Sequence, residues 1–285
     1  MNGPEASLHD RARLRAPRPP LALLVPGLLA LLLLVAPFLA LVVAAPWDRI
    51  GAVITDGPVA EALLLSLRTA CVSTVLSVAL GVPLAWLIAR GNLPGAGLLR
   101  AVVTMPMVLP PVVGGVALLS LLGRRGLLGQ HLDAWFGVQV PFTSAAVVLA
   151  QTFVALPFLV LSVDGALRGL DGRVEGMAAS LGASRWYVFR RVTLPLVAPG
   201  VAAGAVLAFA RSLGEFGATI TFAGSFPGTT RTMPIAIYLA LERDPGSAVA
   251  LSLVLIAVSL VVLVALRSRW LGGLASRGAE LGGLR

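Results

Sequence analysis

The sequence contains no lysine, only one cysteine and only two histidines. All 22 of its basic residues are therefore arginines. A Walker A motif needs its lysine to reach the β- and γ-phosphates of ATP, so the chain has no P-loop of its own. Cys71 cannot form an intramolecular disulfide, and no group of cysteines, histidines and carboxylates has the spacing of a metal site. An ATP-driven function would therefore need a second chain to bind the nucleotide.

Charge is scarce and long hydrophobic runs are abundant. The chain is 58% hydrophobic and 12% charged, whereas a soluble domain carries about 25% charged residues. A bilayer core of about 30 Å is crossed by roughly 20 apolar residues in a helix. Apolar runs of that kind occupy residues 21–45, 62–89, 101–122, 141–167, 196–222 and 247–266. We therefore predict an all-α integral membrane protein with six transmembrane helices in one membrane domain, residues 21–267.

The first apolar run follows a basic segment and ends at Ala44 and Ala45, which is also the pattern of a cleaved signal peptide. Its length of about 25 residues exceeds the 7–15 residues that are usual for the hydrophobic region of such a peptide. We therefore interpret it as a retained helix. The Arg- and Pro-rich residues 1–20 before it are predicted to be disordered and to contact anionic lipid.

The net charge of +9 raises the alternative of nucleic-acid binding. The arginines are instead distributed by membrane side. Fifteen lie in the two tails and in the segments that follow the second and fourth runs, whereas five lie in the other loops. The positive-inside rule then places both termini in the cytosol. The tails 1–20 and 268–285 are therefore predicted to be cytoplasmic, and no nucleic-acid partner is expected.

Residues 171–195 form a polar, arginine-bearing segment between two apolar runs. Asp171 is a candidate N-cap for a first short helix, and Gly182 suits the left-handed position at the end of that helix. Ser184 can cap a second short helix, which Pro195 is predicted to end. One interpretation is an interfacial hairpin whose arginines touch lipid headgroups. The other is a surface on which a partner protein docks.

An arginine inside the fifth apolar run is the strongest candidate for a functional site. Placing Arg211 in a membrane costs about 2.5–3.5 kcal/mol, and Glu215 four residues later would share its helix face and pair with it. Ser212, Thr219 and Thr221 add hydroxyl groups nearby. One interpretation is a buried ion pair that fixes helix packing. The other is a gate or pore wall for a hydrated anion.

The third run contains Pro106, Pro110 and Pro111, which remove backbone donors and bend a helix. Within a membrane, the freed backbone groups are tolerated only against protein or a wet cavity. The pattern is equally consistent with a packing kink and with a helix that lines a translocation path.

Enzymatic catalysis finds no support in the sequence. His9 and His131 lie in polar segments, far from the serines of the apolar runs, so no Ser–His pair is expected. Asp164, near the end of the fourth run, is interpreted as an interface residue rather than a proton relay. No catalytic residue and no metal ligand is predicted.

Three strings resemble the permeases of ATP-binding-cassette (ABC) importers. The spacing of Gly182, Val192, Leu194 and Pro195 resembles their cytoplasmic coupling loop, although Glu175 lies seven rather than the usual six residues before the glycine. Leu-Pro-Pro-Val-Val-Gly-Gly, 109–115, with Leu-Leu-Gly-Arg-Arg-Gly, 121–126, resembles the molybdate and sulfate branch. Gly-Glu-Phe-Gly-Ala-Thr-Ile-Thr-Phe, 214–222, and the string 227–238 are most similar to the molybdate permeases.

This resemblance implies a type I ABC importer permease of the bacterial cytoplasmic membrane, with the segment 171–195 as its coupling hairpin. Two copies would form the pore, cytosolic ATPase subunits would use ATP and Mg²⁺, and an extracytoplasmic binding protein would deliver an oxyanion. No cofactor is expected on this chain itself. The residues expected to contact the ATPase are Glu175, Ala178, Ala179, Gly182, Ala183, Arg185, Leu194 and Pro195. Those expected along the substrate path are Pro110, Pro111, Arg211, Ser212, Glu215, Thr219 and Thr221.

Two alternatives to a molybdate importer stay open. A sulfate, thiosulfate or tungstate permease would have the same build, because the pore sequence does not read the anion closely. A stand-alone ion-coupled carrier or channel would instead use Arg211 and Glu215 as a charge relay and would need no ATPase.

Overall fold

The computed structural model describes residues 20–91 and 93–282, and within these ranges the regular secondary structure is entirely helical. The chain divides into two compact units, Met1–Ala44 and Ala45–Arg285. The first unit contains α1, Leu21–Val43, with Pro26 and Pro37 inside the helix. The predicted disorder of the N-terminal tail and the interpretation of His9 concern residues 1–19, which lie outside the described residues.

The second unit contains the remaining helices. In chain order they are α2 (Ile50–Thr55), α3 (Gly57–Arg90), α4 (Ala96–Val108), α5 (Pro111–Leu122), α6 (Gly129–Phe136), α7 (Ser144–Arg168), α8 (Gly172–Ser180), α9 (Arg185–Val188), the π-helical turn η1 (Phe189–Thr193), α10 (Leu194–Leu213), α11 (Gly217–Ala223), α12 (Met233–Arg243) and α13 (Pro245–Gly282). Helix α13 thus continues through most of the predicted tail 268–285.

Within the described ranges, five helices are long and apolar enough to cross a membrane, and a sixth span exists if α4 and α5 together make one. The third predicted span, 101–122, is not one straight helix, because α4 and α5 meet at an angle of 113°. Leu109 and Pro110 are extended there, and the successive prolines deprive the chain of the donors that a continuous helix needs. The fifth predicted span, 196–222, also differs, since α10 ends at Leu213 and a separate short helix follows.

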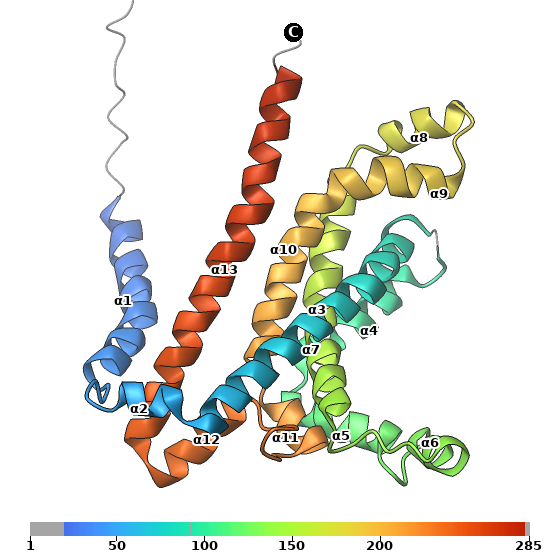
Figure 1. Ribbon diagram of the computed structural model, residues 1–285. Helices are drawn as coiled ribbons and strands as arrows, with labels where there is room; N and C mark the ends of the chain where they lie inside the picture. The colour runs from blue at the N-terminus through green and yellow to red at the C-terminus, as the bar shows by residue number, and fades with distance from the viewer. Residues whose placement is uncertain (1–19, 92, 283–285) are drawn as a thin grey trace, which may run out of the picture. The chain divides into compact units, whose positions relative to one another are not determined.

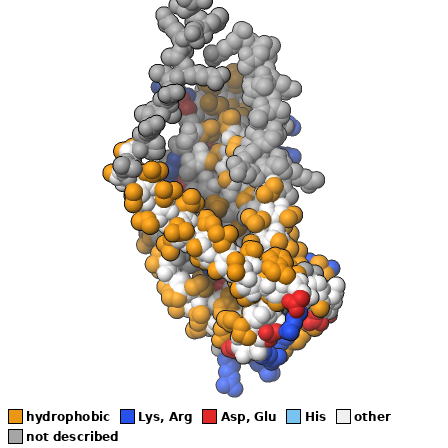
Figure 2. All heavy atoms as spheres, turned by 90° about the vertical axis from the view of Figure 1, so that its left-hand side faces the viewer, with side chains coloured by type: hydrophobic (Ala, Val, Ile, Leu, Met, Phe, Trp, Pro, Cys, Tyr) orange, Lys and Arg blue, Asp and Glu red, His pale blue; other side chains and the backbone are white. Residues whose placement is uncertain are grey.

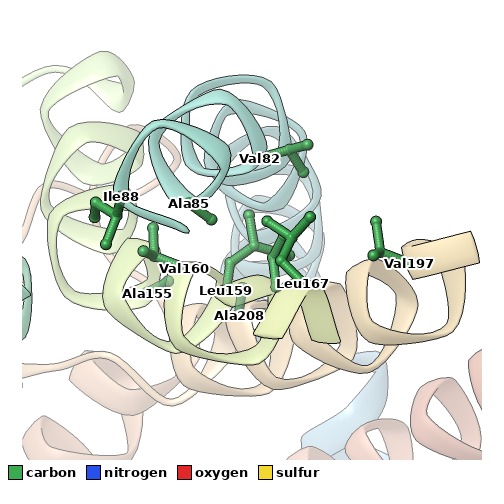
Figure 3. Close-up of a cluster of buried hydrophobic side chains, with 10 residues drawn as sticks. Val82, Ala85, Ile88, Ala155, Leu159, Val160, Leu167, Val197 and Ala208 are labelled. Carbon is green, nitrogen blue, oxygen red and sulfur yellow. The ribbon is translucent and has the colours of Figure 1, made fainter. Parts of the chain in front are cut away.

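Helices α3, α7 and α10 pack against one another and form the core of the second unit (Figure 1). Their buried side chains are aliphatic and include Val82, Leu159 and Val197 (Figure 3). Membrane helices are not driven together by the hydrophobic effect, because lipid is itself apolar. They associate through close packing, which small residues allow. A Cβ atom on Gly81 would lie 2.6 Å from Leu159 Cδ2, and one on Gly204 would lie 3.0 Å from Leu159 Cδ1.

The two ends of this core carry different structures. Helices α8 and α9 form a hairpin at one end, whereas α5, α6 and α11 lie at the other (Figure 1). In the view of Figure 2, hydrophobic side chains predominate, and charged side chains gather at the lower end of the molecule, where Figure 1 places α2 and α12. Helix α6 lies in the segment between α5 and α7.

Candidate functional site

The hairpin α8–α9 begins and turns where the sequence predicts. The Asp171 side chain caps α8 by accepting a hydrogen bond from the backbone N–H of Arg173 at 3.0 Å. Gly182 has a φ of +84°, a left-handed conformation that favours glycine because it has no Cβ. The Ser184 Oγ accepts a hydrogen bond from the N–H of Tyr187 at 3.3 Å and caps α9. All three predictions are confirmed.

Pro195 does not end the helix that it was predicted to end. Helices α9 and α10 are joined through η1 into one continuous span from Arg185 to Leu213. A proline lacks a backbone donor, and its ring crowds the carbonyl four residues earlier. The π-helical turn lies immediately before Pro195, with the N–H of Leu194 bonded to the carbonyl of Phe189 five residues earlier. This wider turn lets the proline enter the first turn of α10 without breaking the helix.

Glu175 points into its own chain. Its Oε2 lies 2.9 Å from Arg90 Nε, and its Oε1 accepts a hydrogen bond from Thr193 Oγ1 at 2.6 Å. Arg90 also donates to the carbonyl oxygens of Leu167 and Leu170 at 2.9 and 3.4 Å. One arginine at the end of α3 thus holds the end of α7, the link that follows it and α8. Sequence reasoning counted Arg90 only as a positive charge beside the membrane and missed this role.

The opposite face of the hairpin is apolar and exposed. Residues on a helix are about 100° apart, so Met177 lies about 200° around α8 from Glu175. Met177 is 61% exposed, and Leu181 beside the turn is 89% exposed. Met177 and Leu181 were not among the predicted contact residues. Of those that were, Ala179 and Arg185 are exposed, and Ala178 and Ala183 are partly buried. Met177 and Leu181 thus give this face of the hairpin an exposed apolar character.

A second charged cluster ties the helices together at the same end. Asp164 is buried, and its Oδ2 lies 3.3 Å from Arg100 Nε and 3.0 Å from Arg168 Nε. Arg100 also donates to the carbonyl oxygen of Ile88 at 3.3 Å. The cluster therefore joins α4 to both α7 and α3. It surrounds the buried Asp164 carboxylate with the positive charge of two arginines.

Arg211 and Glu215 form an ion pair at the other end of α10. Arg211 Nη1 lies 2.6 Å from Glu215 Oε2, and the Glu215 side chain is only 1% exposed, whereas that of Arg211 is 26% exposed. The prediction that they share a helix face is wrong, because α10 ends at Leu213 and Glu215 lies beyond it. The other carboxylate oxygen of Glu215, Oε1, accepts a hydrogen bond from the backbone N–H of Ala218 at 2.8 Å and so satisfies a donor in the first turn of α11. The pair therefore joins the two parts of a broken helix.

The two helix breaks lie against each other. A Cβ atom on Gly217 would be 3.0 Å from Pro111 Cβ, and one on Gly115 would be 2.8 Å from the carbonyl oxygen of Ala218. The break before α5 thus contacts the start of α11. Thr221, also in α11, donates to the carbonyl oxygen of Gly217 at 2.8 Å. The structure therefore assembles many of the predicted path residues where two interrupted helices meet.

Two further predicted path residues are buried, as Glu215 is. Ser212 is fully buried, and its Oγ is 2.9 Å from that of Ser73, which in turn accepts a hydrogen bond from Thr152 Oγ1 at 3.2 Å. These hydroxyls link α3, α7 and α10. Thr219 is also fully buried. Sequence alone could not distinguish the orientation of these two side chains from that of Arg211.

The sequence profile of the family described as binding-protein-dependent transport system inner membrane components matches residues 81–272. The chain belongs to this family. It is 51% identical over 245 residues to the molybdenum transport system permease protein ModB of Mycobacterium tuberculosis, covering 86% of this chain and 92% of the relative. It is 44% identical to the Escherichia coli ModB over 227 residues, covering 80% and 99%. The sulfate transport system permease protein CysT of E. coli is 35% identical over 223 residues, covering 78% and 80%.

Solved structures are similar to this chain in fold. A bacterial ABC transporter involved in the import of alginate aligns with a TM-score of 0.68 at 19% identity, over 87% of this chain and 93% of the other. The methionine transporter MetNI aligns with a TM-score of 0.54 at 16% identity, over 73% and 91%. The prediction of a multi-pass membrane protein with the type I ABC importer permease fold is confirmed. The relatives are permease subunits, which agrees with a non-catalytic role for this member of the family.

Proposed function

We propose that this chain is the membrane-spanning permease subunit of an ATP-driven molybdate importer of the bacterial cytoplasmic membrane. The observation that carries the proposal is its 51% identity to a molybdenum transport permease over 92% of that protein. The identity to the sulfate permease is lower, at 35% over 80% of that protein. Sulfate import is therefore the second candidate, because sulfate and molybdate are both divalent tetrahedral oxyanions.

The hairpin α8–α9 is the proposed contact with a cytosolic ATPase subunit, which binds the ATP and Mg²⁺. One face of the hairpin contacts the partner, and the other face attaches the hairpin to the rest of the chain. Exposed Met177 and Leu181 offer an apolar surface to the partner, while Glu175 on the other face is held by Arg90 and Thr193. A movement of the ATPase therefore pulls on α3, α7 and α10 through charge-assisted bonds rather than through a loose loop. This arrangement requires the hairpin to lie in the cytosol. We propose that α4 and α5 make the sixth span, which places both termini in the cytosol as well.

The continuous helix from Arg185 to Leu213 carries this movement toward the other end of the molecule. Arg185 and Arg211 are 26 positions apart, which corresponds to roughly 39 Å along the helix axis at 1.5 Å per residue, and this axis bends between α9 and the lower part of α10 (Figure 1). A helix of that length acts as a lever, and the interrupted segments at its far end are the places where the backbone can adjust. Rocking of such rigid parts alternately opens the path to the two sides of the membrane.

Arg211 is the proposed contact for the passing oxyanion. Its guanidinium is partly exposed, whereas the carboxylate that neutralises it is buried. An unpaired arginine in a membrane would hold a divalent anion tightly, but transport needs contacts that are weak enough to release it. Glu215 moderates the positive charge and so permits release. We propose that a second copy of the chain contributes the opposite wall, and that an extracytoplasmic binding protein delivers the anion.

Uptake of radiolabelled molybdate tests the proposal. A strain without its own molybdate permease should regain uptake when this chain is expressed with its ATPase and binding protein. Uptake should disappear when the P-loop lysine of the ATPase is replaced, and excess unlabelled molybdate should compete better than excess sulfate. Uptake that survives the ATPase change would overturn the proposal in favour of a stand-alone carrier. Stronger competition by sulfate would instead assign the chain to sulfate import.

A further inference from the structure

An apolar groove of about 400 Å³ lies where the end of α3 meets α9. Pro83, Trp86 and Leu87 form one side, and Trp186 and Phe189 form the other. The volume falls in the range of about 300–1,000 Å³ that is typical of ligand sites. Apart from one arginine, every lining side chain is apolar. The groove is therefore suited to a hydrocarbon ligand rather than to a polar one.

The aromatic rings give the groove fixed walls. Trp86 and Phe189 meet edge to face with ring centroids 5.9 Å apart, and Trp186 stacks on Phe189 at 5.7 Å. Trp186 nevertheless remains 67% exposed and Leu87 43% exposed. Large apolar side chains that are exposed beside a concave surface favour binding of an apolar ligand, which would cover them.

The arginine of the groove is Arg185. Within the described part of the chain its guanidinium has no ion pair and no hydrogen-bond partner, whereas Arg90 and Arg100 at the same end are paired with carboxylates. Arg190, which is also exposed and unpaired there, does not line the groove. A free positive charge at one apolar groove is complementary to an acyl chain that carries a negatively charged headgroup.

We propose that this groove binds one anionic phospholipid, with an acyl chain against the aromatic walls and the headgroup phosphate on Arg185. The groove residues of α3 belong to a helix that is long and apolar enough to cross the membrane. With α3 across the bilayer, its last turns lie at the membrane surface, within reach of lipid headgroups and the adjoining acyl chains. Tryptophan and arginine at a membrane interface commonly place an apolar body in the lipid and a polar tip at the headgroups. This position favours a lipid over a side chain of the ATPase.

The proposed lipid would also affect the coupling hairpin. A neighbouring cavity of about 650 Å³ is lined by Arg90 and Glu175 and shares Trp86, Arg185 and Phe189 with the groove. A lipid that fixes these shared walls would stiffen the attachment of α8 to α3. The groove itself does not depend on the proposed transport function. Two points do rest on the proposed transport function: that the lipid lies in the cytosolic leaflet, and that the lipid affects coupling to the ATPase.

Quenching of tryptophan fluorescence by brominated lipids tests the proposal directly. The full chain is placed in nanodiscs after Trp47, Trp135 and Trp270 are replaced by phenylalanine, which leaves only the two groove tryptophans. Nanodiscs of phosphatidylcholine receive a tenth of dibrominated phosphatidylglycerol or, in parallel, a tenth of dibrominated phosphatidylcholine. We expect at least twofold stronger quenching by the anionic lipid.

Substitution of the groove arginine completes the test. Arg185→Gln should abolish the preference for the anionic lipid, whereas the matched control Arg190→Gln, which removes an arginine outside the groove, should retain it. Equal quenching by both lipids in the unsubstituted background would overturn the proposal. So would a loss of the preference in both arginine variants, which would indicate a diffuse electrostatic effect. Displacement of both lipids by the added ATPase subunit would assign the groove to that protein instead. The experiment measures tryptophan quenching and not transport. Its result therefore neither supports nor overturns the proposed import function.

Discussion

The ion pair between Arg90 and Glu175 offers the sharpest test of how the hairpin is attached. We predict that removing either charge by substitution with glutamine loosens α8, and that removing both adds little more. Helix α8 has nine residues and no buried side chain, so it is too short to be stable alone. Its persistence depends on the contacts made by Glu175. Glutamine has nearly the helix propensity of glutamate, so the substitution isolates the charge.

The magnitude follows from the burial of the pair. Exposed ion pairs contribute about 0.2–1 kcal/mol, whereas removing one partner of a buried pair costs about 3–5 kcal/mol. The Arg90 and Glu175 side chains are 25% and 18% exposed, which places them between these limits, at about 2 kcal/mol. At 1.4 kcal/mol for each factor of ten, this corresponds to a roughly 30-fold change in the local opening equilibrium.

Hydrogen exchange of the α8 amides, followed by mass spectrometry on the full chain in nanodiscs, measures this opening equilibrium. Glu175→Gln should raise exchange in α8 about 30-fold, and Arg90→Gln somewhat more, because Arg90 also holds two carbonyl oxygens. The double variant should match Arg90→Gln, and the control Arg191→Gln should leave α8 unchanged. Strictly additive effects would refute the direct contact. An unchanged α8 in Glu175→Gln would show that the carboxylate acts elsewhere, for example on the ATPase.

Three further predictions concern the other contacts. Glu215→Gln should leave the partly exposed Arg211 without its counterion and lower thermal stability by about 3 kcal/mol, together with molybdate uptake; unchanged melting in nanodiscs and unchanged uptake would exclude this. Gly115→Ala should destabilise the protein by about 1–3 kcal/mol because its Cβ would press on backbone at 2.8 Å, whereas Gly97→Ala, with open space around it, should not; equal melting of the two variants would contradict the packing. Gly182→Val should strain the turn by about 1–2 kcal/mol and reduce the amount of ATPase that copurifies, while Gly176→Ala should have no such effect.

The local features of the hairpin could be read from the sequence because their causes are local. Asp171, Gly182 and Ser184 act on backbone groups within three residues, so cap and turn chemistry predicted their roles. The apolar runs likewise predicted the membrane class, since hydrocarbon solvates long apolar helices regardless of how they are arranged. The resemblance to importer permeases was confirmed by the family to which the chain belongs.

The errors arose where the chain interrupts a helix. Pro195 was predicted to stop a helix, but the π-helical turn before it accommodates the missing backbone N–H of the proline, and the helix continues. The fifth run was predicted to continue to residue 222, yet α10 ends at Leu213. Hydropathy averages over about 20 residues and cannot distinguish one long helix from a helix, a turn and a second short helix.

The sequence by itself determined that the chain is a helical membrane protein, because composition and hydropathy need no knowledge of contacts. It also determined the likeness to molybdate permeases through short, specific strings. Only the tertiary structure decided which polar groups meet: Glu175 turns inward to Arg90, 85 positions away, and Ser212 bonds to Ser73. Such pairings depend on how helices distant in sequence rotate and pack against each other. A periodic sequence pattern predicts which face of a helix is apolar, but it does not predict which helix packs against that face.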